Sequence, residues 1–109
     1  MSKTITHIAL FVVEPRTART NSENYEPTFH TSYEDAHKSI WDYTKRRIGD
    51  VYLEEAREEN EQYAELEDNE IVKLLENSTF EEQEKWMEWL FDYEDDESNR
   101  AFYYIKEIT

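Results

Sequence analysis

Residues 79–93 read TFEEQEKWMEWLFDY, and this stretch organises the second half of the chain. Thr79 and Glu82 have the spacing of a capping box, in which each side chain accepts a hydrogen bond from the other residue's free backbone amide. Beyond them, acidic and mostly apolar side chains fall on opposite sides of a helix of 3.6 residues per turn. The inner face comprises Gln83, Trp86, Met87, Leu90 and Tyr93, and the outer face comprises Glu81, Glu84, Glu88, Asp92 and Asp95. We therefore predict an amphipathic helix that begins at 77–79.

A first helix is predicted farther upstream, between residues 31 and 49. Thr31 and Glu34 match a second capping box. Apolar residues follow at three- and four-residue steps, and the cations at 45–47 fall in the expected last turn, where the helix dipole favours them. Gly49 is the only glycine in the chain, and we expect it to end this helix as a left-handed cap.

Two more helices are predicted between residues 50 and 75. Asp50 is expected to cap a helix that continues to Leu66 and carries glutamate on its outer side. The pair at 68–69, Asp and Asn, marks a break and a new cap before a short apolar helix at 71–75. Together with the other two, these segments make three to four helices in succession.

Strands are predicted at the two ends of the chain. The expected segments are Thr4–Val13 as a central strand, Thr28–His30 as an edge strand, and Arg100–Ile108 as a closing strand. Pro27 cannot donate to a ladder, which puts the second strand at an edge, and Arg16–Glu26 is expected to be a loop. The predicted fold is a single α+β domain over 1–109, in which an antiparallel sheet of two to three strands carries the helices on one face.

Negative charge is concentrated in the second half. The net charge is −15 over 109 residues, yet the first fifty residues hold seven acids and seven Lys or Arg. From Glu54 to Glu97 there are 19 carboxylates against three cations. Aromatic residues make up 15% of the chain, far too many for a disordered acidic tail. The neutral first half argues against general adaptation to salt, which would spread acids over the whole surface.

Like charges stand one helical turn apart in several places, as at Glu54 and Glu58 or Glu84 and Glu88. Such pairs destabilise a helix by roughly 0.2–0.5 kcal/mol each, and the anions after residue 91 also oppose the dipole at the expected helix end. A sequence that retains such repulsion although it lowers stability suggests a binding function. The candidate partner-binding residues are Glu54, Glu55, Glu58, Glu59, Glu61, Glu65, Glu81, Glu84, Glu88, Asp92, Glu94, Asp95, Asp96 and Glu97.

Small size, absence of cysteine and carboxylate-rich helices such as residues 54–59, EEAREE, resemble the DNA-mimic inhibitors of phages and plasmids. These include anti-restriction and anti-CRISPR proteins, a class with many unrelated folds. The resemblance covers residues 50 to 97. It implies a non-catalytic inhibitor that occupies the DNA-binding surface of a host defence nuclease complex. The partner would be a basic nucleic-acid-binding Cas or restriction component, met in the cytoplasm of the host cell by a monomer or homodimer.

An immunity protein or antitoxin that neutralises one basic nuclease toxin would use the same electrostatics, and it is the alternative hypothesis. We expect no catalytic site, no metal and no cofactor: with 27 acids in the chain, no one carboxylate pair is distinctive, and the three histidines lack ligand spacing. The apolar run at 8–13 is too short for a membrane span and lacks a cleavage site, so we expect neither a signal peptide nor a membrane anchor.

Overall fold

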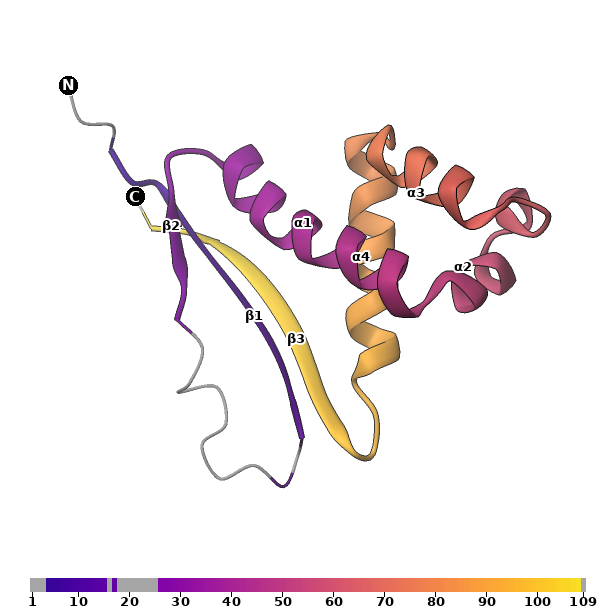
Figure 1. Cartoon of the computed structure of the whole chain (residues 1–109). Coiled ribbons are helices and arrows are strands. Elements are labelled where there is room, and N and C mark those ends of the chain that lie inside the picture. Colours follow the sequence, from indigo (N-terminus) through magenta and orange to yellow (C-terminus); the bar gives the residue numbers. More distant parts are fainter. Residues whose placement is uncertain (1–3, 16, 18–25, 109) are drawn as a thin grey trace.

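The structure, a computed structural model, describes residues 4–15, 17 and 26–108. Its elements, in chain order, are β1 (His7–Pro15), β2 (Thr28–His30), α1 (Tyr33–Val51), α2 (Leu53–Glu59), the short 3-10 helix η2 (Glu61–Tyr63), α3 (Asp68–Glu76), α4 (Phe80–Glu94) and β3 (Asn99–Glu107). The strands form one antiparallel sheet in the order β2-β1-β3. The two long strands lie side by side, and all the helices fall between β2 and β3 in the chain (Figure 1).

One face of this sheet joins the hydrophobic core. The register pairs Ala9 with Ile105, Phe11 with Tyr103 and Val13 with Ala101, and these six side chains all belong to the core or pack against it. Because side chains alternate along a strand, the neighbouring residues point to the other face, where Val12 is nonetheless fully buried. On that other face, the described rings of Phe29, Phe102 and Tyr104 are 63%, 37% and 39% exposed.

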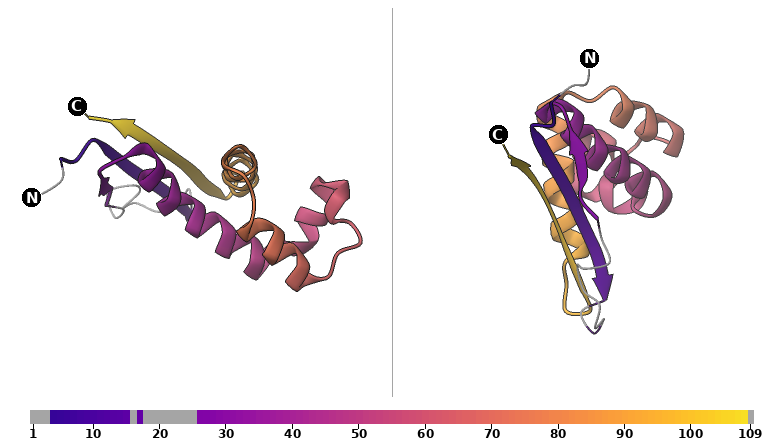
Figure 2. Two further views of the ribbon diagram at one scale, coloured as in Figure 1. Left: turned by 90° about the horizontal axis from the view of Figure 1, so that it is seen from above. Right: turned by 90° about the vertical axis from the view of Figure 1, so that its left-hand side faces the viewer.

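Helices α1 and α4 cross each other over the core face of the sheet (Figures 1 and 2). The Phe11 ring of β1 stacks on Tyr43 of α1, with ring centroids 4.4 Å apart, and meets Phe91 of α4 edge-on at 6.2 Å. Ile40 and Leu90, from the two helices, are fully buried. The molecule is flat, with extents of 47 × 39 × 17 Å, and α2 and α3 extend away from the sheet (Figure 2).

The predicted fold class is confirmed: the sheet has three antiparallel strands, and β1 is its central strand. The capping box at the start of α4 is also confirmed, because Glu82 N donates to Thr79 Oγ1 at 3.2 Å and Thr79 N donates to Glu82 Oε1 at 2.9 Å. The predicted loop at 16–26 lies outside the described residues, apart from Thr17 and Glu26. Within the described part of the chain, no helix is both long enough and apolar enough to cross a lipid bilayer.

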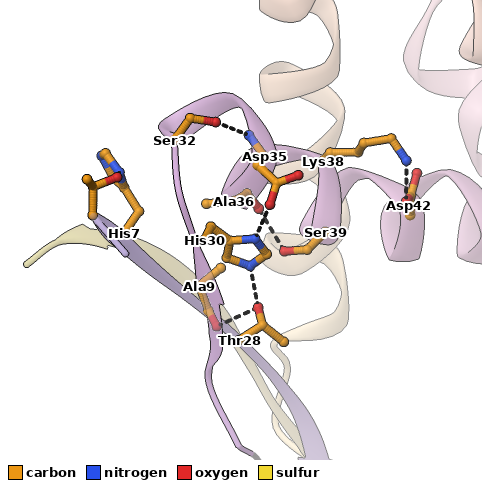
Figure 3. Close-up of polar contacts among 11 residues, drawn as sticks. His7, Ala9, Thr28, His30, Ser32, Asp35, Ala36, Lys38, Ser39 and Asp42 are labelled. Atoms are coloured by element: carbon orange, nitrogen blue, oxygen red, sulfur yellow. Dashed lines mark hydrogen bonds and ion pairs between the residues drawn. The ribbon is translucent and has the colours of Figure 1, made fainter. Parts of the chain in front are cut away.

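The predicted cap of α1 was wrong by one residue. Ser32, not Thr31, is the N-cap, and its hydroxyl accepts a hydrogen bond from Asp35 N at 3.1 Å. The Asp35 carboxylate lies 2.7 Å from His30 Nδ1, and Thr28 Oγ1 lies 2.6 Å from His30 Nε2 (Figure 3). Asp35 therefore fastens the first turn of α1 to the edge strand, and this contact favours a helix that begins after Ser32.

The predicted end of α1 was also wrong. Gly49 lies inside the helix, which continues through Asp50 to Val51, so Asp50 caps nothing and the cations at 45–47 are not in the last turn. A Cβ placed on Gly49 would lie 3.6 Å from Val72 Cγ2 of α3. The glycine thus marks the place where α3 packs closely against α1. Tyr52 is the C-cap of α1 and, without a side-chain cap bond, the N-cap of α2.

The second predicted helix is shorter than expected. It ends at Glu59, and Asn60 then caps the separate turn η2 through its side chain. Arg57 explains the compact turn back, because its guanidinium donates to Glu54 Oε1, to Leu66 O and to Asp68 Oδ1. The cap of α3 is Glu67 rather than a residue at 68–69, since Glu67 and Glu70 form a capping box.

Substitution of Gly49 by alanine tests the corrected end of α1. Alanine inside a helix is favoured over glycine by roughly 0.5–1 kcal/mol, and the new methyl group would make an ordinary van der Waals contact with Val72. We expect Gly49→Ala to raise the free energy of unfolding in urea by about that amount. A loss of stability would indicate instead that residue 49 ends the helix in a left-handed conformation.

Candidate functional site

Two adjoining hollows lie between α4 and the α2–η2 segment. One, of about 340 Å³, is lined by Glu59, Asn60, Gln62, Glu82, Lys85, Trp86 and Trp89. The other, of about 580 Å³, is lined by Glu59, Lys85, Glu88, Trp89 and Asp92. Since Glu59, Lys85 and Trp89 line both, we treat the hollows as one feature and call their combined lining the acidic groove.

The acidic groove brings together carboxylates that are distant in the sequence. Glu59 comes from the end of α2, whereas Glu88 and Asp92 stand one turn apart on α4. All three are exposed, and among the described residues none of the three carboxylates forms an ion pair or a hydrogen bond. The two acidic helices therefore present their charges to a shared space, with Trp89 between them.

Aromatic rings around Trp89 form a continuous row of ring contacts. Trp89 meets Trp86 edge-on at 5.2 Å, lies 5.5 Å from Tyr93, and meets Tyr52 edge-on at 6.5 Å. Tyr63 of η2 in turn lies 5.4 Å from Trp86. Trp86 is 6% exposed and Tyr63 is 4% exposed, so they belong to the core, while Trp89 is only partly buried.

The other eleven candidate residues lie outside the groove lining. Glu54 is engaged with Arg57. Glu55 is half-buried, and one of its carboxylate oxygens is buried without a hydrogen bond. Glu84 is half-buried, and its charge adds to burial in raising the pKa of Tyr33. Exposed carboxylates that do not line the groove are Glu58, Glu61, Glu65, Glu81 and Glu97.

Glu94 was wrongly predicted to face a partner: it is 5% exposed. Tyr43 Oη donates to Glu94 Oε1 at 3.2 Å, and both Arg47 Nε and Tyr52 Oη donate to Oε2 at 3.2 Å. The helical period placed it inside, because Glu94 follows Leu90 by four residues and Met87 by seven, and both are buried on the inner face. The acidic run around it had suggested the opposite.

The buried carboxylate changes the titration of its neighbours. Burial, and then the charge of Glu94, raise the pKa of both Tyr43 and Tyr52. Burial opposes ionisation of Arg47, but its hydrogen bond and attraction to Glu94 outweigh this and raise its pKa. All three donors thus keep their protons in the folded protein.

Asp95 and Asp96 are exposed but have structural roles in the turn between α4 and β3. Asp95 Oδ1 accepts from Ala101 N at 3.0 Å. Asp96 Oδ1 accepts from Ser98 N at 2.8 Å and from Asn99 N at 2.7 Å. Their carboxylates fix the start of β3, which explains why these acids stand where the helix dipole disfavours them.

Glu82 and Lys85 line the groove, although the sequence did not predict them there. Glu82 had been explained by helix capping, and its bonds to the backbone and hydroxyl of Thr79 do lower its pKa. The same residue nevertheless lines the groove. Lys85 lies one helical turn before Trp89, so the helical period alone could have placed it on the same side as Trp89. Asn60 and Gln62 depend on the turn at η2, which no sequence pattern indicated.

Within the described residues, the His, Asp and Glu side chains form no group of three or more that could hold a metal ion. Comparison of the chain with protein-family models, curated proteins and solved structures gave no match. The function must therefore be inferred from the geometry and charge of the chain itself.

Substitution of Glu94 by glutamine tests the role of the buried carboxylate. The new amide would keep the shape of the side chain but would turn one acceptor into a donor facing Arg47 or a tyrosine hydroxyl. We expect Glu94→Gln to lower the free energy of unfolding by about 1–3 kcal/mol in denaturant titrations. The control Glu97→Gln, at an exposed position, should change it by no more than about 0.5 kcal/mol. Equal effects would contradict the assigned role.

The raised pKa of Tyr43 predicts a particular pH dependence. A tyrosine whose pKa is raised by folding contributes stability that is fully present below its unfolded pKa of about 10 and is lost as pH rises toward the folded value. Tyr43→Phe removes the bond to Glu94, so it should be less stable than the wild type near pH 8. The difference in stability between the two proteins should narrow above about pH 10, because only the wild type has a Tyr43 hydroxyl whose ionisation destabilises the fold. Unfolding midpoints measured across this range check it, and a constant gap would contradict it.

Proposed function

We propose that this protein is a non-catalytic inhibitor that mimics nucleic acid and occupies the DNA-binding surface of a host defence nuclease complex, of the CRISPR-Cas or restriction type. The observation that carries the proposal is the acidic groove. Glu59 on one side and Glu88 and Asp92 on the other are exposed, unpaired among the described residues and held on different helices around one hollow.

The arrangement of charge suits nucleic-acid mimicry. Glu88 and Asp92 are separated by four residues, a rise of about 6 Å along α4, which is close to the spacing of phosphates along one strand. A hollow with carboxylates on both sides resembles a duplex groove between its two rows of phosphates. Proteins that bind DNA present Lys and Arg surfaces to such an array, so the same surfaces would attract this protein.

Part of the acidity is available to a partner because the fold does not use it. Glu94, Asp95 and Asp96 have internal hydrogen bonds, whereas the groove acids Glu59 and Asp92 have none among the described residues. Association through unpaired anions is fast, and it depends strongly on salt. The expected setting is the cytoplasm of the host cell, where the target complex would act on DNA.

Charge reversal within the groove should abolish inhibition. The test variant combines Glu59→Lys, Glu88→Lys and Asp92→Lys. The control combines Glu26→Lys, Glu34→Lys and Glu107→Lys, three exposed positions outside the groove. Both variants change the net charge equally. DNA binding by purified Cas and restriction complexes is measured by fluorescence anisotropy with each protein as competitor.

The wild type and the control variant should reduce DNA binding by at least one complex, and the groove variant should not. Inhibition should weaken as salt rises above about 0.15 M, where the Debye length is near 8 Å. Undiminished DNA binding by every complex at low salt would refute the proposed function. Equal inhibition by the two variants would show that total charge matters and the groove does not.

A further inference from the structure

The acidic groove contains more than charge, because an indole lies between its carboxylates. Trp89 lines both hollows and is fixed on three sides by Trp86, Tyr93 and Tyr52. A fixed ring needs no ordering when a ligand arrives, so little conformational entropy is lost on binding. A pure phosphate mimic would require no aromatic surface at this place.

We propose that the acidic groove is a receptor for arginine side chains carried by a basic segment of the partner protein, with the guanidinium over Trp89 and between the carboxylates of Glu59, Glu88 and Asp92. This inference rests on the proposed function in one respect: it takes the partner to be a basic nucleic-acid-binding protein. It adds the recognition element and the preferred residue type.

The chemistry of the lining selects this occupant. A cation above an indole face is attracted by the negative face of the ring, and carboxylates around it add attraction of the same sign. Arginine suits this lining better than lysine, because its planar guanidinium stacks on rings and is less strongly hydrated. A second copy of this chain, with a net charge of −15, is a poor occupant, and nucleic acid is excluded by the same repulsion.

Lys85 gives the groove a resident cation. It lines both hollows, and among the described residues it forms no ion pair, so its ammonium group remains an exposed charge beside four carboxylates. One of these carboxylates, Glu82, feels the attraction of Lys85, which contributes to the lowered pKa of that carboxyl group after the Thr79 bonds. An arriving arginine must share the groove with this lysine, and removal of Lys85 should strengthen binding.

The experiment uses the full chain and a short peptide of alternating arginine and glycine, with a second peptide in which lysine replaces arginine. Affinities are measured by calorimetry at about 0.15 M salt. The indole N–H resonances of the protein are followed by NMR during the titration. We expect a preference for the arginine peptide of roughly twofold to fivefold. The Trp89 resonance should shift, and that of Trp41, which is 5% exposed, should not.

Variants separate the groove from general acidity. Trp89→Leu keeps the charge and should lose the preference for arginine, while Tyr104→Leu, on the other face of the sheet, should retain it. Lys85→Gln should bind both peptides more tightly than Lys73→Gln, which makes the same change of charge on α3 outside the groove. Unfolding curves establish that each variant is folded, and the NMR titration of the wild type does not depend on any variant.

Opposite results would overturn the inference. It fails if the Trp89 resonance does not move while the peptide binds, or if Trp89→Leu retains the arginine preference. The proposed function fails separately: a protein that binds arginine in the groove but leaves DNA binding by every complex unchanged supports the receptor and refutes the inhibitor. Conversely, a Trp89→Leu variant that still reduces DNA binding supports the inhibitor and refutes the receptor.

Discussion

The buried carboxylate of Glu94 links α4 to α1 and to the start of α2, and α2 and α4 carry the exposed negative charge of the protein. Burying an anion is costly unless hydrogen bonds and opposite charge compensate, and here three donors converge on it: two on α1 and the third from Tyr52, the residue that joins α1 to α2. Since these donors belong to fixed helical positions, they set the rotation of α4 about its own axis. Asp92 precedes Glu94 by two residues, about 200° around the helix, so an inward Glu94 turns Asp92 outward.

The acidity of the second half therefore consists of two groups of carboxylates with different physical roles. One group makes internal contacts: Glu94 with its donors, Glu54 and Asp68 with Arg57, and the turn acids before β3. These contacts lower the free energy of the fold. The other group, represented by Glu59, Glu88 and Asp92, is exposed and unpaired among the described residues, and it leaves repulsion uncompensated. A count of charges overstates the second group, because only the structure separates it from the first.

Local signals in the sequence predicted a good part of the fold. The capping box at Thr79 and the apolar period after it located α4, and Pro27 indicated an edge strand, because these features act over a few residues. Gly49 misled because a glycine near a helix end is usually a cap, whereas here α1 continues past it and packs against Val72 of α3, a contact that only tertiary packing creates. The fold class followed from the order of the elements, which local errors of this size do not change.

The groove could not be predicted in the same way. Glu59 is 29 residues before Glu88 in the chain, and the lining is completed by residues 60 and 62 of a turn that only the structure reveals. Arg57 holds this turn, because its guanidinium donates to the carbonyl of Leu66 and to the carboxylate of Asp68. Arg57 had counted only as one of the few cations in an acidic stretch. In the structure, its three hydrogen bonds hold the segment after α2 against that helix. Asn60 and Gln62 of this segment complete the lining beside Glu59. A cation outside the lining thus helps to shape one wall of the anionic surface.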